Sequence, residues 1–274
     1  MTESRLVPPP DACDCHIHVF ETGFAVAPTA LSAPPLAPLS AYREVQQALG
    51  LSRAVVVQPT AYGFDNSCTL QSMAALGPAA RGIVVIQPRT PTEELQRLHD
   101  LGVRGVRYMM LPGGALPWET LEATAANIEP LGWHIDLQVD GRQFHDYEAR
   151  LASLPCRLVV DHNGKFLTPV APSHEGFQAL LRLLASGRCW VKLSAPYETS
   201  RSGPPAFDDV GVLARALVQA NPQRCLWASN WPHLNTNPQP SNAQMLDLLL
   251  AWADDDATRK QILVENPAEL YGFA

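Results

Sequence analysis

The chain has 274 residues and a formal net charge of −7, with 46% hydrophobic and 17% charged residues. This length suits one large domain or two small ones, and the composition is that of a globular protein. An acidic balance without a basic run argues against binding to nucleic acid or to an anionic membrane. Neither a signal peptide nor an apolar run of membrane-spanning length is present, so we expect a cytoplasmic protein.

Eight short apolar segments recur along the chain and are predicted to be β-strands. They span residues 12–20, 53–59, 81–88, 103–110, 133–140, 157–164, 189–196 and 224–233. Most of them are apolar along their whole length rather than alternating. This pattern is typical of parallel strands that are buried on both faces by helices.

Segments with helical periodicity separate the strands and begin near residues 40, 66, 90, 117, 142, 173, 207 and 241. Ser40, Asn66 and Thr92 are suitable N-cap residues for three of them. Eight strands that alternate with eight helices predict an α/β fold, a single (β/α)8 TIM-type barrel over residues 1–274, regular or distorted. Residues 21–39 are then a long first loop. An open doubly wound sheet is the alternative, but the glycine-rich motif expected after its first strand is missing.

The first predicted strand contains CDCHIHVF, which places His16 and His18 one residue apart. Alternate residues of a strand share a face, so we expect both imidazoles on one face and Cys13 and Cys15 on the other. The chain has six cysteines and no CxxC pair. They are expected to be reduced core residues, and Cys13-Asp14-Cys15 is not expected to bind zinc.

Polar residues follow most of the predicted strands, and the carboxyl ends of the strands form the active site of a (β/α)8 barrel. Histidines, cations and hydroxyls that converge there exceed what packing requires, so this mouth is a candidate small-molecule site. Arg104 and Arg107 lie three apart and face opposite sides of their strand. Arg107, nearer the strand end, is expected in the mouth, whereas His134 starts its strand and belongs to the opposite end.

Three motifs resemble the amidohydrolase superfamily: CDCHIHVF in the first strand, VVDHNG at the sixth and LWASNWPH at the eighth. Through VVVQPTAYGFDN, VRGVRY and the closing LVENPAELYGF, the chain is more closely similar to one branch of it. That branch contains 2-pyrone-4,6-dicarboxylate lactonase and galactarolactone isomerase. The resemblance implies a metal-independent enzyme that hydrolyses or isomerises a small carboxylated lactone.

Superfamily members with a metal centre add a carboxylated lysine or a glutamate on the fourth strand, histidines on the fifth and sixth, and an aspartate on the eighth. The fourth strand of this chain ends in RYMM and the fifth in DLQVD, and the eighth offers Asn230. A binuclear centre therefore lacks half of its ligands. One zinc ion on His16, His18 and His162 remains as an alternative, which would give a mononuclear metal-dependent hydrolase or decarboxylase.

Asn230 also bears on the reaction. In a lactonase of the branch, an aspartate at this place activates water, whereas galactarolactone isomerase carries asparagine and the substrate's own hydroxyl attacks the carbonyl. Asparagine cannot take up a proton near neutral pH, so Asn230 favours isomerisation. Hydrolysis would need another base, such as Asp136, Asp161 or His162. An engineered replacement of aspartate by asparagine would also explain the residue at position 230.

The resemblance and the strand-end positions together give a predicted site. His16, His18, His162 and Asn230 are the expected catalytic residues, the three histidines as hydrogen-bond donors to the lactone carbonyl. The expected substrate-binding residues are Arg107 and Lys165 for a carboxylate, and Tyr108, Thr60, Ser194 and Tyr197 for hydroxyls. A catalytically retired barrel that binds a small acid is a further alternative, for which Asn230 is the support.

Overall fold

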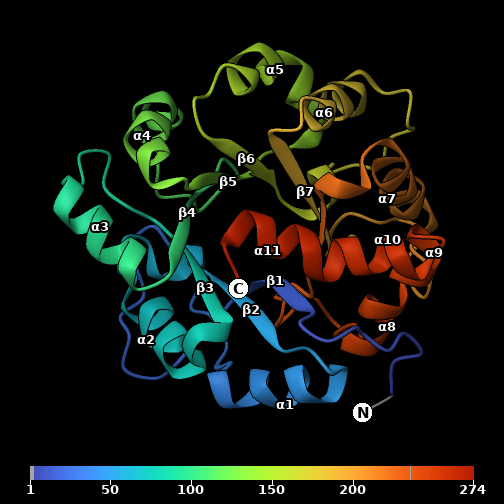
Figure 1. The fold of residues 1–274 in the computed structure, drawn as a ribbon, viewed down its shortest axis with the longest axis horizontal. Coiled ribbons are helices and arrows are strands. Elements are labelled where there is room, and N and C mark those ends of the chain that lie inside the picture. Colours follow the sequence, from blue (N-terminus) through green and yellow to red (C-terminus); the bar gives the residue numbers. More distant parts are fainter. Residues whose placement is uncertain (1–2, 235) are drawn as a thin grey trace.

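The computed structural model describes residues 3–234 and 236–274. Eight parallel strands follow one another around a single sheet in sequence order. They are β1 (Cys13–Ile17), β2 (Arg53–Val57), β3 (Ala80–Val84), β4 (Val103–Met109), β5 (His134–Gln138), β6 (Arg157–Val160), β7 (Cys189–Leu193) and β8 (Cys225–Trp227). A bridge between Ile17 and Trp231 brings the chain after β8 beside β1, so the barrel is nearly closed (Figure 1). The predicted (β/α)8 fold is confirmed.

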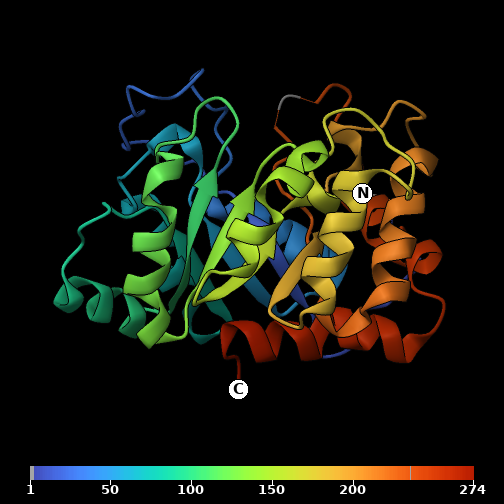
Figure 2. The ribbon, with the colours of Figure 1, turned by 90° about the horizontal axis from the view of Figure 1, so that it is seen from above.

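Helices lie between the strands and cover the outside of the barrel (Figures 1 and 2). They are α1 (Leu39–Leu49), α2 (Ser67–Leu76), α3 (Thr92–Asp100), α4 (Leu121–Ile128), α5 (Phe144–Ala152), α6 (Glu175–Ala185), α7 (Asp208–Ala220) and α8 (Asn242–Asp247). Of the three predicted N-caps, only Asn66 occupies that position, because α1 and α3 begin after Pro38 and Pro91. Asn66 bonds instead to the backbone of Val85, which ties α2 to the end of β3.

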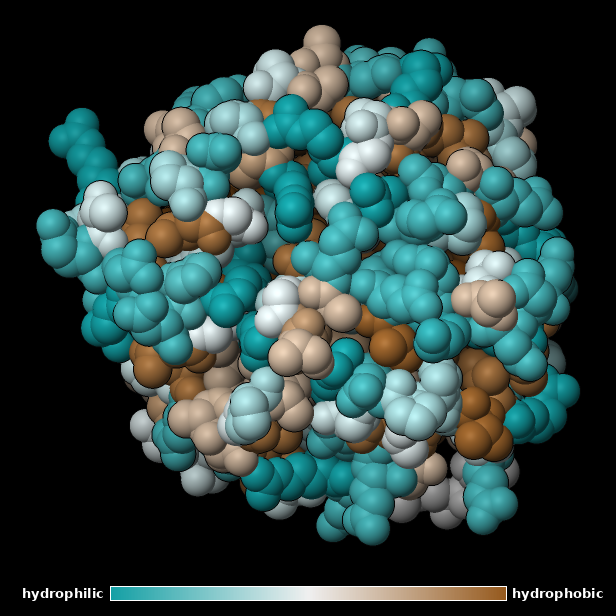
Figure 3. Space-filling model, viewed as in Figure 1, coloured by the Kyte–Doolittle hydropathy of each residue, from teal (hydrophilic) through white to brown (hydrophobic). Residues whose placement is uncertain are grey.

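The remaining helices, α9 (Leu249–Trp252), α10 (Asp256–Lys260) and α11 (Asn266–Tyr271), follow α8. Figure 2 shows α11 lying across the amino-terminal end of the barrel, and Figure 3 shows mostly polar residues over that face. Inside, the Tyr271 ring packs edge-on against His134, with 5.5 Å between ring centroids. His134 therefore lies at the amino-terminal end of the barrel, as predicted, and helps to close it, whereas the barrel is open at the other end. No helix within residues 3–234 and 236–274 has the length and apolar character needed to cross a lipid bilayer.

A β-bulge in β1 sets the direction of its side chains. Asp14 and Ile17, three residues apart, pair with residues of β2 that are only two apart, so Cys15 and His16 oppose one residue of β2. Cys13 and Cys15 pack in the apolar cluster inside the barrel, on the same side as His16. The expectation that the cysteines face away from the histidines is wrong, because the bulge interrupts the alternation. All six cysteines are free and buried.

Candidate active site

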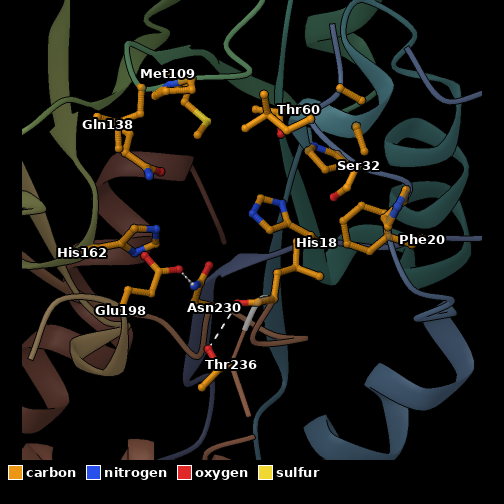
Figure 4. Close-up of a pocket in the computed structure, with 18 of the residues that line it drawn as sticks. His18, Phe20, Ser32, Thr60, Met109, Gln138, His162, Glu198, Asn230 and Thr236 are labelled. Atoms are coloured by element: carbon orange, nitrogen blue, oxygen red, sulfur yellow. Dashed lines mark hydrogen bonds between the residues drawn. The ribbon is translucent and has the colours of Figure 1, made fainter. Parts of the chain in front are cut away.

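A cavity of about 650 Å³ opens at the carboxyl ends of the strands, a size suited to a small molecule. Its apolar wall includes residues of the long first loop, from Ala30 to Pro35, together with Phe20 and Met109 (Figure 4). Its polar wall includes His18, Thr60, Arg107, Gln138, His162, Lys165, Tyr197, Glu198 and Asn230. The predicted convergence of polar residues on this mouth is therefore present.

Beneath the cavity, the fully buried Lys192 holds together a cluster of charged residues. Its Nζ lies 2.5 Å from Asp136 Oδ2, 3.1 Å from Asp161 Oδ1 and 3.1 Å from His16 Nδ1. Burial alone would lower the pKa of Lys192, but the two carboxylates raise it, so the side chain stays a cation. Burial and the charge of Asp161 raise the pKa of Asp136 to about 7. Although burial opposes it, Lys192 keeps the pKa of Asp161 well below its usual range.

The contacts of Lys192 determine the tautomers of the histidine pair. Since an ammonium can only donate, His16 accepts at Nδ1 and carries its proton on Nε2. That Nε2–H donates to His18 Nε2 at 3.1 Å, and His18 Nδ1–H donates to the Val57 carbonyl at 2.8 Å. Both N–H groups of the neutral pair therefore have partners within the protein, and the donor role toward a lactone carbonyl stays a prediction. His16 lies behind His18, which forms part of the cavity wall.

Burial keeps the imidazoles of the site neutral. Burial, followed by the charge of Arg107, lowers the pKa of His18 to about 3. Burial likewise lowers the pKa of His16 and of His162 well below its usual value. Neutral imidazoles can exchange protons with a substrate, but they add no charge to the cavity.

His162 lies at a sharp turn after β6, where it has a φ of 53°. Its Nδ1 is 2.8 Å from the hydroxyl of Ser194, which lies just after β7. Because a hydroxyl can donate or accept, His162 can offer either a lone pair or an N–H at Nε2. The turn also presents Lys165 to the cavity, and burial lowers the pKa of that lysine to about 8. Ser194 was predicted to contact the substrate, but it is buried behind His162 and does not line the cavity.

Asn230 lies beside β1 at the cavity mouth, with a φ of 58° that asparagine tolerates better than most residues. Its backbone N–H donates to His16 O at 3.1 Å. Its side-chain amide donates to Tyr197 Oη at 2.9 Å. It also donates to Glu198 Oε1 at 3.0 Å (Figure 4). With both amide protons engaged, Oδ1 is the atom of Asn230 that can accept a hydrogen bond from a ligand.

Glu198 forms an ion pair with Lys165 through its second carboxylate oxygen. Neither Glu198 nor Lys192 was among the residues predicted for the site. The available signal for Lys192 was a charged residue within the otherwise apolar strand CWVKL, which requires a buried partner.

Arg107 and Tyr108 are neighbours on β4 and therefore face opposite sides of the barrel wall. Arg107 faces inward and donates to Gln58 O at 2.8 Å and to Gln138 Oε1 at 3.2 Å. Tyr108 faces outward, and its hydroxyl bonds to Thr120 and Thr124 at 2.9 and 2.7 Å. The structure thus corrects the assignment of Tyr108 to the cavity, whereas Thr60 and Tyr197 line it as expected. Arg104 lies outside and donates to His99 O.

Among residues 3–234 and 236–274, the group that could hold a metal ion is His16, Asp161 and His162, whose ligand atoms lie within 4.8 Å of one another. The Lys192 ammonium, however, is 3.1 Å from both His16 Nδ1 and Asp161 Oδ1. At a separation of ~4 Å and an effective dielectric constant of ~20, a divalent ion and an ammonium repel each other by roughly 8 kcal/mol. In this arrangement, the donor set does not fit a metal ion.

The fold and the cavity together define a (β/α)8-barrel protein with a small-molecule site at the carboxyl ends of its strands. Residues 13–273 match the family described as Amidohydrolase, and the chain belongs to that family. It is 34% identical over 268 residues to D-galactarolactone isomerase of Agrobacterium fabrum, which covers 96% of this chain and 91% of the relative.

Another relative is the 2-pyrone-4,6-dicarboxylate hydrolase of Comamonas testosteroni, 32% identical over 276 residues, which cover 96% of this chain and 90% of that one. A crystal structure of an Agrobacterium tumefaciens protein in its apo form has a TM-score of 0.93 at 33% identity, with 98% of both chains covered. The superfamily and the branch that the sequence motifs indicated are both confirmed.

Proposed function

We propose that the protein is an enzyme that isomerises a small carboxylated lactone by moving its ester bond from one hydroxyl to another. The observation that carries this proposal is Asn230, which places an amide, not a carboxylate, beside His162 in the cavity wall. Relatives of the chain include a lactone isomerase and a lactone hydrolase, which supports the reaction class. An amide can orient a nucleophile but cannot activate water by taking its proton.

Recognition of the substrate begins with Arg107. Arg107 lines the cavity, and its guanidinium bonds only to neutral acceptors among the described residues, so it can pair with an anionic group that enters the cavity. A guanidinium pairs well with a carboxylate because both are planar and their hydrogen bonds are charge-assisted. Thr60 and Tyr197 lie in the same wall and can contact hydroxyls of the substrate.

The bond exchange uses a nucleophile that the substrate itself provides. A free hydroxyl, oriented by Asn230 Oδ1, attacks the lactone carbonyl while its proton passes to His162 Nε2. The ring C–O bond then breaks, and the departing oxygen takes the proton back from His162, so the product is an isomer and no water is consumed. A hydroxyl held close to the carbonyl needs less activation than water, which suits an imidazole with a low pKa.

The remaining histidines act from one side of the cavity. His18 forms the wall next to the reacting group, and His16 holds His18 in its tautomer from behind. We further propose that the reaction requires no metal ion, because the Lys192 ammonium already supplies positive charge next to His16 and Asp161. The mononuclear metal-dependent hydrolase or decarboxylase is the alternative. A cytoplasmic location is part of the same proposal.

Turnover of a panel of aldarolactones and muconolactones in H₂¹⁸O tests the reaction. Isomerisation gives products without label, whereas hydrolysis adds one ¹⁸O to the new carboxylate. In Asn230→Asp we expect labelled hydrolysis product to appear, since the new carboxylate can act as a base, an effect of about 10²-fold or more in other enzymes. No turnover of any lactone, together with turnover of amides or other esters, would refute the proposal. Thermal stabilisation by a lactone without turnover, in wild type and in Asn230→Asp, would indicate a retired barrel.

A further inference from the structure

We infer that Glu198 restricts the site to lactones that carry a single anionic group. The inference rests on the proposed function and names the substrate class of the same cavity. Among the described residues, five histidine, arginine, lysine or glutamate side chains line the cavity wall: His18, Arg107, His162, Lys165 and Glu198. Since burial keeps both histidines neutral, two cations and one carboxylate determine the charge of the wall.

Glu198 neutralises Lys165. The two side chains form an ion pair and are 9% (Lys165) and 21% (Glu198) exposed, so water screens the pair only in part. Glu198 Oε1 also accepts from Asn230 Nδ2 at 3.0 Å, so both carboxylate oxygens are engaged and the side chain is held in place. Lys165 could bind a carboxylate of the substrate only by leaving Glu198 unpaired in a partly buried position.

Arg107 is left as the cation with no carboxylate partner among the described residues of the wall. It donates to a backbone carbonyl and to a side-chain amide, both neutral, and its Nε is free. The charged cluster beneath the cavity adds no positive charge, because Lys192 in that cluster pairs with the carboxylates of Asp136 and Asp161. The wall therefore carries one net positive charge.

One net positive charge matches a lactone with one carboxylate, such as an aldarolactone in which the second carboxyl belongs to the ring. A second carboxylate or a sulfonate would meet Glu198, a like charge, and would have no cation left to pair with. Glu198 is thus a specificity-determining residue: its charge rejects dianionic lactones, and its hydrogen bond holds Asn230.

The test compares tetrahydrofuran-2-carboxylate with tetrahydrofuran-2,5-dicarboxylate as unreactive ligands, measured by calorimetry. We expect the wild type to bind the monocarboxylate more tightly. In Glu198→Gln, which keeps the size of the side chain and the acceptor for Asn230, we expect the ratio of the two Kd values to shift by about tenfold toward the dicarboxylate, because Lys165 becomes available. Glu198→Asp keeps the charge and should keep the wild-type preference.

Glu148→Gln provides the matched control, since it removes the same charge from a surface ion pair with Arg182. It should leave the ratio of Kd values unchanged. An unchanged ratio in Glu198→Gln, or tighter binding of the dicarboxylate by the wild type, would overturn the inference. Because calorimetry needs no turnover, a protein that shows this preference but converts no lactone would contradict the proposed function and leave the charge selectivity standing.

Discussion

Replacing Lys192 by methionine tests whether one charge holds the buried cluster together. Methionine keeps an unbranched side chain of similar length and removes the ammonium. Asp136 and Asp161, both fully buried and within 2.5 and 3.1 Å of Nζ, would lose their cation. Removing one partner of a buried ion pair costs about 3–5 kcal/mol, so we expect the free energy of unfolding to fall by about that amount near neutral pH.

The loss should depend on pH. Without Lys192, burial and mutual repulsion are expected to raise the pKa of Asp161 above its value in the unfolded chain, about 3.9. A carboxyl whose pKa is raised by folding stabilises the protein below the unfolded pKa, and this stability is lost as the pH rises toward the folded pKa. The slope is about 1.4 kcal/mol per pH unit for each such carboxyl. The variant should therefore lose stability between about pH 4 and neutrality, a range in which the ionised, lysine-paired Asp161 of the wild type contributes no such loss.

Urea denaturation followed by circular dichroism, at several pH values between 5 and 8, measures this difference. The double variant Lys192→Met/Asp161→Asn removes one of the two uncompensated carboxyls and should recover about half of the loss. Imidazole ¹⁵N NMR should also show that His16 no longer holds its proton on Nε2 alone. A loss below about 1 kcal/mol that stays constant over this pH range would refute the reasoning, because that is the size of an exposed ion pair.

Three further predictions concern the cavity and its surroundings. In the wild type, kcat/KM should fall as the pH rises through about 8, because Lys165 loses its proton there and the cavity wall loses its net positive charge. In Lys165→Arg this decrease should move to higher pH, since arginine stays protonated. Identical pH profiles of the two proteins would contradict the dependence on the lysine charge. Tyr108→Phe should lower the free energy of unfolding by about 1 kcal/mol, through lost bonds to Thr120 and Thr124, and change kcat/KM by less than about twofold. A large loss of kcat/KM would show that Tyr108 does contribute to the active site. Dialysis against a chelator should leave turnover unchanged; activity that disappears and returns with zinc would favour the metal-dependent alternative.

The order of elements and the end of the barrel that carries the site could be predicted from the sequence alone. Apolar runs and helical periodicity are local patterns, and each of the eight predicted strands is present in the structure. Parallel strands all end on the same side, so strand-end residues were expected to converge. His18, Arg107, His162, Lys165 and Asn230 indeed line one cavity, although their roles in the reaction remain predictions.

The pairing of charges within the site was decided by the tertiary structure. The bulge in β1 directs Cys15 and His16 to the same side of the strand. The alternation of residues in the sequence does not predict this bulge. The contact of Lys192 with two carboxylates depends on the register of β5, β6 and β7. The ion pair of Lys165 and Glu198 depends on two turns that follow different strands. Register, bulges and turn geometry result from contacts between residues distant in sequence, so local patterns determine which polar residues reach the cavity but not which of them neutralise one another.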